Sequence, residues 1–107
     1  VEKLESNLSD IEAVQFTDEN KDRVYSWGSY VQQNVCHSWD EKGNPILKIP
    51  PRFKGEETEE EICFFGSYLV NENGRIRVMN GAEFEQNYEL IGSSKAFDFI
   101  GIYHRKQ

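Results

Sequence analysis

The residues of this sequence that could carry out chemistry are two cysteines and two histidines, and their spacing argues against a shared site. Cys36 and His37 are adjacent, whereas Cys63 and His104 lie far along the chain. Nucleophilic catalysis needs a thiol, a base and an orienting group held together, but neighbours on a strand point to opposite faces. Zinc ligands usually come in pairs about two to four residues apart, which adjacent residues do not match. We therefore predict no catalytic residue, no metal site, no cofactor and no enzyme.

The two cysteines also bear on the redox state. They do not form a Cys-x-x-Cys pair, and a disulfide would require an oxidising compartment. The sequence shows no export signal. We therefore expect Cys36 and Cys63 to be buried free thiols.

The net charge of −7 is unevenly distributed over the 107 residues. Residues 1–61 contain fourteen acidic and seven basic side chains, and residues 62–107 contain five of each. The acidic side chains are densest at Glu56, Glu57, Glu59, Glu60 and Glu61. Nucleic acid is bound through clustered Lys and Arg, so we expect no nucleic-acid partner. We interpret the glutamates as a solvated loop, and the alternative is an acidic patch that docks on a basic protein or mimics nucleic acid.

Length and hydropathy indicate one domain that spans residues 1–107. Residues 1–8 are polar and expected to fray, and residues 52–61 are expected to form a charged loop. No apolar run approaches the roughly 18 residues that cross a bilayer, so we expect no membrane partner.

The pattern of apolar residues predicts the order of the elements. Residues 11–16 read as a strand covered on both faces. Thr17 is expected to cap a helix in which Val24, Trp27 and Val31 share one face. The remaining strands are expected at 35–39, 46–49, 62–70, 75–79, 88–91 and 96–103, with a short helix at 82–87. These elements indicate an α+β fold, a mainly antiparallel, curled sheet of five to seven strands packed on one principal helix plus a short second helix.

The chain contains, in this order, residues 11–17 (IEAVQFT), 66–70 (GSYLV), 74–78 (GRIRV) and 84–89 (FEQNYE). Together these four stretches resemble the pattern of a group of small phage and prophage proteins. The family pattern opens with an EAVQ-aromatic strand, continues with a Gly-Asp-aromatic strand and a hairpin, and closes on Phe-x-x-x-Tyr-Glu. This chain has Ser67 in place of the Asp. The resemblance covers residues 10 to 91 and implies a phage accessory protein in the bacterial cytoplasm, with no chemistry assigned to particular residues.

Three function hypotheses follow. The first is a non-enzymatic phage or prophage protein that binds and modulates a bacterial host protein. The second is a small structural or assembly component of the virion. The third is a small-molecule-binding protein or enzyme with a pocket near Tyr68, Arg75 and Arg77, whose arginines could pair with an anionic ligand. The alternative for the two arginines is a solvated strand face.

The oligomeric state is left open by the sequence. Phe97, Phe99 and Tyr103 alternate near the C-terminus, and such aromatic side chains could either cover the core or form the edge of a homodimer.

Overall fold

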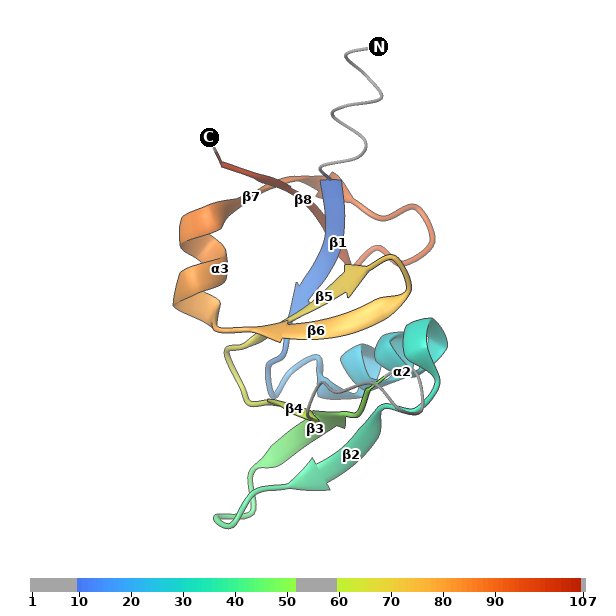
Figure 1. Cartoon of the computed structure of the whole chain (residues 1–107), viewed down its shortest axis with the longest axis vertical. Helices are drawn as coiled ribbons and strands as arrows, with labels where there is room; N and C mark the ends of the chain where they lie inside the picture. The colour runs from blue at the N-terminus through green and yellow to red at the C-terminus, as the bar shows by residue number, and fades with distance from the viewer. Residues whose placement is uncertain (1–9, 52–59, 107) are drawn as a thin grey trace.

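The computed structural model describes residues 10–51 and 60–106, which form two sheets and two helices (Figure 1). In chain order the elements are β1 (Asp10–Gln15), α2 (Lys21–Gln32), β2 (Cys36–Trp39), β3 (Pro45–Ile49), β4 (Glu61–Cys63), β5 (Tyr68–Glu72), β6 (Arg75–Met79), α3 (Gly81–Asn87), β7 (Tyr88–Ser93) and β8 (Gly101–Arg105). The α+β class with a mainly antiparallel sheet, one principal helix and a short second helix is confirmed. The strands are divided between two sheets.

The larger sheet has five strands in the order β6-β5-β1-β8-β7, and all its neighbouring strands are antiparallel. The sheet curls, and α3 lies between its two outer strands, β6 and β7 (Figure 1). Asn80 caps this helix, because its side chain accepts hydrogen bonds from the N–H groups of Ala82 and Glu83. The short helix therefore joins the two edges of one sheet.

The inner face of the curled sheet is filled by aromatic rings. Phe84 of α3 is fully buried and stacks on Tyr68 and Tyr88, at centroid distances of 4.1 and 4.8 Å. The ring of Tyr103 meets Phe84 edge-on at 4.8 Å. Such pairs add to the free energy gained from burial alone, so these rings hold α3 against β5 and β8.

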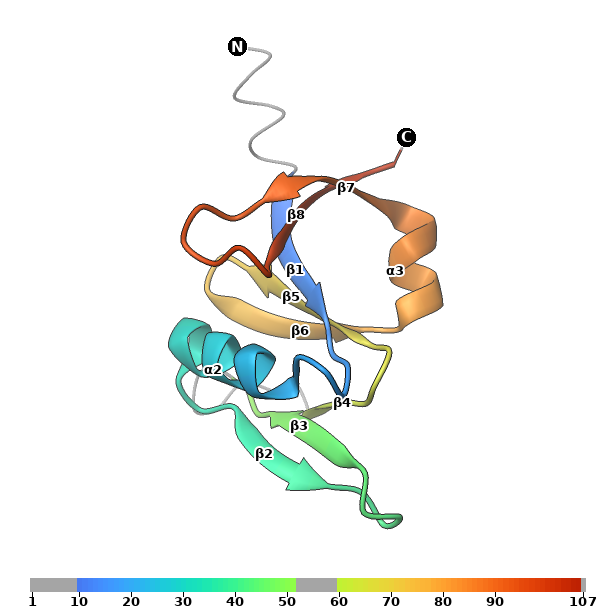
Figure 2. The same cartoon turned by 180° about the vertical axis from the view of Figure 1, so that it is seen from behind.

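The opposite face of this sheet packs on α2 and on the smaller sheet, which has the order β2-β3-β4 (Figure 2). Both views place α2 between the two sheets. Their shared core consists of Val14, Phe16, Val24, Trp27, Val35, Leu47, Ile49, Cys63, Leu69, Ile76 and Ile100. β1 contributes Ala13 to the aromatic cluster and Val14 to this core, so the predicted burial of this strand on both faces is confirmed.

A buried amide joins the two layers. Gln32, at the end of α2, is the one buried polar side chain among the described residues. Its Oε1 accepts a hydrogen bond of 2.8 Å from the backbone N–H of Ile76 in β6, and its Nε2 donates to the carbonyl of Pro50 at 2.8 Å. Because both ends of the amide are used, the cost of burying it is offset.

The predicted continuous strand over residues 62–70 is wrong. The segment forms β4 in the smaller sheet and β5 in the larger one, with a turn between them. Gly66 has a φ of +96°, a conformation that glycine adopts without steric cost. The N–H of Gly66 donates to the carbonyl of Phe16, and the N–H of Phe16 donates to the carbonyl of Ser67, so the turn is held against the end of β1.

The predicted last strand at 96–103 begins later, at Gly101. The hydroxyl of Ser94 accepts from the N–H groups of Ala96 and Phe97, and the N–H of Ile100 donates to the carbonyl of Phe97. These bonds fold residues 94–100 into a loop. Phe97 and Phe99 are half-buried from this loop against the core next to α2.

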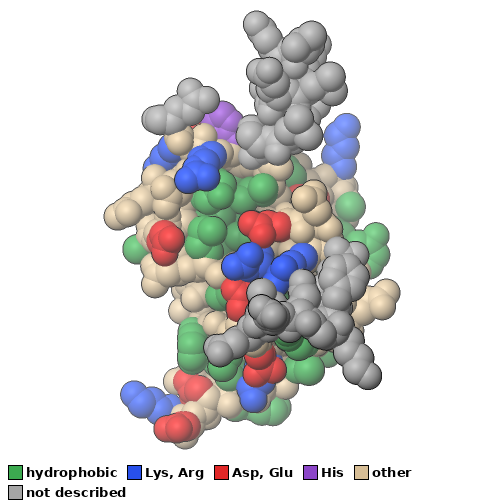
Figure 3. Space-filling model, in the orientation of Figure 1, with side chains coloured by type: hydrophobic (Ala, Val, Ile, Leu, Met, Phe, Trp, Pro, Cys, Tyr) green, Lys and Arg blue, Asp and Glu red, His purple; other side chains and the backbone are tan. Residues whose placement is uncertain are grey.

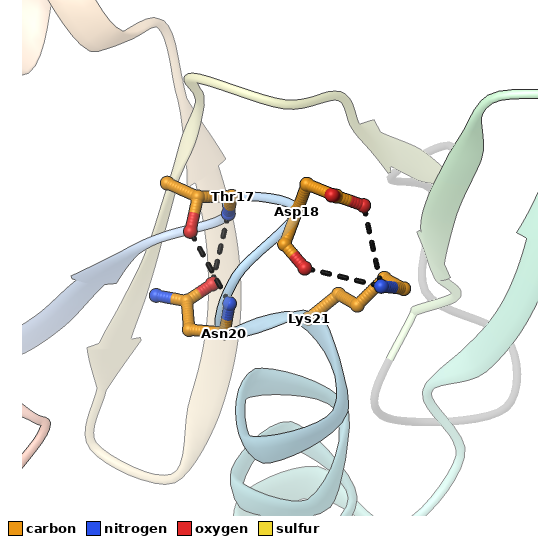
Figure 4. A network of polar contacts seen from close by, with 4 residues as sticks. All are labelled: Thr17, Asp18, Asn20 and Lys21. Carbon is orange, nitrogen blue, oxygen red and sulfur yellow. Dashed lines mark hydrogen bonds and ion pairs between the residues drawn. The ribbon is translucent and has the colours of Figure 1, made fainter.

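The predicted Thr17 cap of α2 is also wrong, because the helix begins four residues later, at Lys21. Thr17 and Asn20 instead exchange hydrogen bonds (Figure 4): Thr17 N–H donates to Asn20 Oδ1 at 2.8 Å, and Asn20 N–H donates to Thr17 Oγ1 at 3.3 Å. Lys21 pairs with Asp18 at 3.2 Å. Thr17 and Asn20 therefore close a turn ahead of the helix. The polar group of Thr17 is used in this turn instead of capping the helix.

None of the helices in the described part of the chain is long and apolar enough to cross a membrane.

Candidate protein-binding surface

The two cysteines lie in different surroundings, and both are free thiols. Cys36 is exposed, so the prediction that it is buried is wrong; it begins the outer strand β2, opposite Lys48. Cys63 is fully buried, and burial raises the pKa of its thiol to about 12. Because the thiolate is the nucleophilic form, this burial disfavours nucleophilic chemistry at Cys63.

The two histidines make other contacts, although His37 and Cys63 lie on either side of Leu47 in the smaller sheet. The ring of His37 meets Tyr25 and Trp39 edge-on, at centroid distances of 5.7 and 5.0 Å. Nε2 of His104 lies 3.0 Å from Oε1 of Glu89. In residues 10–51 and 60–106, no three His, Cys, Asp or Glu side chains are grouped to hold a metal ion.

Tyr68, predicted to line a pocket, lies instead in the aromatic cluster. Its side chain is 6% exposed and its hydroxyl donates a hydrogen bond of 2.8 Å to Oε2 of Glu85 in α3. Burial raises the pKa of Tyr68 strongly, and the bond to Glu85 raises it further. Burial also raises the pKa of the neighbouring Tyr103. The Tyr68 hydroxyl therefore acts as a neutral donor that attaches α3 to β5.

The two arginines lie on the outer strand β6 beside acidic side chains. Arg75 is opposite Glu72 in the strand register. Nε of Arg77 lies 3.3 Å from Oε2 of Glu61, without the alignment of a hydrogen bond, and its NH1 lies 3.6 Å from Oε1 of Glu72. These carboxylates partly neutralise Arg77, and an anionic ligand for the two arginines stays a prediction.

The predicted acidic patch is only partly within the described residues. Glu56, Glu57 and Glu59 lie outside them, as do residues 1–8. Of the predicted loop at 52–61, residues 52–59 lie outside the described residues, Glu60 is exposed, and Glu61 belongs to β4 rather than to a loop. Oε1 of Glu61 accepts a long hydrogen bond of 3.4 Å from the N–H of Val78 in β6. Glu61 therefore links the two sheets, in addition to its pairing with Arg77.

The smaller sheet carries exposed apolar side chains that the core does not absorb. Trp39 is 60% exposed and Phe64 49% exposed, and Ile62 and Phe65 are also exposed. Figure 3 shows hydrophobic side chains over the region of this sheet, next to acidic and basic ones. We call Trp39, Ile62, Phe64 and Phe65 the aromatic surface. Exposed apolar side chains of this size gathered together are typical of interaction sites.

An open hollow of about 660 Å³ lies within this surface. Its lining combines three exposed members of the aromatic surface, the buried Ile46 and polar side chains of both charges: Trp39, Ile46, Ile62, Phe64, Asp40, Glu41, Lys42, Asn44 and Lys48. An apolar centre with a polar rim is the usual composition of a protein interface.

One side of this hollow is lined by the turn between β2 and β3. Oδ1 of Asp40 accepts hydrogen bonds from the N–H groups of Lys42 and Asn44, at 2.9 and 2.8 Å. Gly43 supplies the positive φ of +86° that closes the turn. The bond from the Asn44 N–H contributes most to lowering the pKa of Asp40, and the turn that Asp40 closes directly follows Trp39.

Sequence reasoning missed this surface because it placed Phe64 and Phe65 inside a central strand. The turn signal from Asp40 to Pro45 beside Trp39 was the available indication. The separation of β4 from β5 places Phe64, directly after β4, at the same hollow as Trp39 of β2, with β3 between these two strands.

Comparisons with models of protein families, with curated proteins and with solved structures give no match to this chain.

Proposed function

We propose that this protein is a non-enzymatic accessory protein of a phage or prophage that binds and modulates a bacterial host protein in the cytoplasm. The observation that carries the proposal is the aromatic surface, in which Trp39 and Phe64 are about half exposed or more beside a hollow. Burying a large aromatic side chain gives more binding free energy than burying most others, and such side chains dominate interface hot spots.

The surroundings of the candidate reactive groups also favour binding over chemistry. The Cys63 thiol is buried, the Tyr68 hydroxyl is bonded to Glu85, and Arg77 lies between two carboxylates. The mixed charge around the hollow, with Asp40 and Lys42 on one turn, suits a partner with an apolar anchor and polar groups around it. The setting in a phage-infected bacterium rests on the family resemblance of residues 10–91.

The test is capture of a partner from lysate of a bacterial host by the immobilised protein and by a Trp39→Ala/Phe64→Ala variant. Tyr30→Ala is a matched control, because Tyr30 is 73% exposed on α2, outside the aromatic surface. We expect one specific host protein to be captured by the wild type and by Tyr30→Ala, and recovery to fall at least about tenfold with the double variant. Equal recovery by all three proteins, or no specific partner, would contradict the proposal.

A further inference from the structure

β7 is the last strand of the five-stranded sheet, and among the described residues no strand pairs with its outer edge (Figure 1). Its inner edge pairs with β8 at every residue except Ile91, so backbone N–H and C=O groups on the other edge point away from the sheet. All residues from Glu89 to Ser93 are exposed. This edge therefore has the backbone geometry to accept another strand.

The edge strand β7 contains two exposed apolar side chains. Leu90 is 62% exposed and Ile91 50% exposed. Leu90 lies against Gly101, where an added Cβ would come within 2.8 Å of its Cδ1. Ile91 is the extra residue at a register shift, because Leu90 pairs with Tyr103 and Gly92 pairs with Ile102. Natural proteins often protect an edge strand with Lys, Pro or a β-bulge; β7 contains no Lys or Pro, and it has the register shift at Ile91.

Charge makes a second copy of this chain a suitable occupant of the edge. All of the net charge of −7 belongs to residues 1–61, and residues 62–107, which contain β7 and β8, carry five charges of each sign. β7 and its neighbour β8 carry Glu89, Arg105 and His104, whose Nε2 lies 3.0 Å from Oε1 of Glu89. Two copies that meet at β7 therefore bring no excess of negative charge together at these two strands.

The sequence of β7 is compatible with pairing to itself. We infer that β7 of one molecule pairs antiparallel with β7 of a second molecule about a two-fold axis. With Leu90 opposite Ile91 of the second copy, Tyr88 is opposite Ser93 and Glu89 is opposite Gly92. Glu89 is the one charged side chain of the strand, and in this register it does not face itself. Such an interface is isologous and closed, so association stops at the dimer.

The size of this edge limits the strength of the dimer. One strand of six residues forms an interface well below the roughly 1,600 Å² that is typical of stable complexes. The register shift at Ile91 also bends the strand, which shortens the paired segment. We therefore expect a dimer that dissociates on dilution. It involves a surface other than the aromatic surface, so it does not depend on the proposed function.

The test is sedimentation equilibrium of the wild type and an Ile91→Lys variant, from about 1 µM to about 1 mM. The wild-type average mass is expected to rise toward twice the monomer mass, whereas Ile91→Lys is expected to stay monomeric, because the ammonium group would be desolvated in the interface. Tyr30→Lys and Trp39→Lys are matched controls that place the same charge at other exposed positions, and both are expected to associate like the wild type.

Two further measurements test whether Ile91→Lys is folded and whether β7 forms the contact. Far-ultraviolet circular dichroism of Ile91→Lys at low concentration checks that the variant folds, as the exposure of Ile91 predicts. Hydrogen exchange of the β7 amides in the wild type is expected to slow at high concentration. A wild type that stays monomeric at about 1 mM overturns the inference, as does an Ile91→Lys variant that associates like the wild type. Loss of association in Trp39→Lys, with retention in Ile91→Lys, also overturns it and assigns the contact to the aromatic surface.

Discussion

At one edge of the five-stranded sheet, the outward N–H groups of β6 are bound by side chains from the other layer, whereas at the opposite edge no described strand pairs with the outer side of β7. Gln32 accepts from the N–H of Ile76 at 2.8 Å, and Glu61 accepts from the N–H of Val78 at 3.4 Å. The edge of β7 instead carries the exposed Leu90 and Ile91. An edge whose N–H groups are occupied cannot easily pair with another chain.

The difference between the two edges suggests that β6 contributes to the stability of the domain and that β7 is the edge for interaction with other molecules. The β6 edge lies against α2 and β4, so its side-chain bonds join the two layers of the molecule. The β7 edge takes no part in these bonds, and its proposed role is self-association. We therefore expect substitutions at the β6 edge to change the free energy of unfolding. We expect substitutions at the β7 edge to change self-association.

Removing the amide of Gln32 has the largest expected effect on this comparison. Gln32→Ala leaves the buried N–H of Ile76 and the carbonyl of Pro50 without their partner, and we expect the free energy of unfolding to fall by about 2–3 kcal/mol. Urea denaturation measures the loss, and faster hydrogen exchange at Ile76 locates it. Asn34→Ala is the control, because it removes only the 3.1 Å contact with Gln32 Nε2 and a longer one to Pro51. Equal losses in both variants would mean that the β6 edge does not depend on Gln32.

The attachment of α3, the helix that joins both edges, gives the next largest effect. Tyr68→Phe keeps the stacking on Phe84 and loses the hydrogen bond to Glu85, so we expect a loss of about 1 kcal/mol near neutral pH. The exposed Tyr30→Phe is the control.

The same substitution changes the dependence of stability on pH. The pKa of Tyr68 is raised in the folded protein above its usual 10.0, chiefly by burial. Below pH 10 the residue is protonated in both states, and above it the unfolded chain releases the proton first, so stability falls as pH rises. The melting temperature of Tyr68→Phe should therefore fall less between about pH 9 and pH 11 than that of the wild type. Part of the decline in melting temperature should persist in Tyr68→Phe, because the pKa values of Tyr103 and Cys63 are also raised by burial. Parallel curves for both proteins would contradict this role of Tyr68.

A smaller effect separates the two contacts of Glu61. Glu61→Gln keeps an acceptor for the N–H of Val78 and loses the ion pair with Arg77, which is partly exposed and also contacts Glu72. We expect a loss below about 1 kcal/mol that shrinks further in high salt. Glu61→Ala removes both contacts and should cost more than Glu61→Gln in the same urea titration. If the two variants lose equal stability, the bond to Val78 contributes nothing to the β6 edge.

Local signals in the sequence predicted the elements that are bounded by turns. The strand expected at 75–79 is β6, which follows a turn in which Asn73 and Gly74 both have positive φ. The short helix expected at 82–87 is α3, which follows the capping residue Asn80. In these cases the residues that determine the structure are close in sequence.

The elements that failed depend on contacts between distant residues. The apolar run at 62–70 does not show that the chain passes from the smaller sheet to the larger one at Gly66. A continuous apolar run suits one buried strand equally well. The alternation of Phe97, Phe99 and Tyr103 resembles a strand, but the first two rings pack beside α2 from a loop. The pairing of Gln32 with Ile76, 44 positions apart, has no local signal, and the aromatic surface depends on the same tertiary arrangement.

The smallest expected change in stability is at the β7 edge, where Ile91→Lys replaces an exposed side chain. Because Ile91 is half exposed and belongs to no core cluster, we expect the free energy of unfolding of the monomer to change by less than about 0.5 kcal/mol. Urea denaturation at low concentration measures this value, while the same variant is expected to abolish self-association at high concentration. A large loss of stability in the dilute monomer would show that Ile91 supports the fold as Gln32 does, and the two edges would then differ in exposure but not in function.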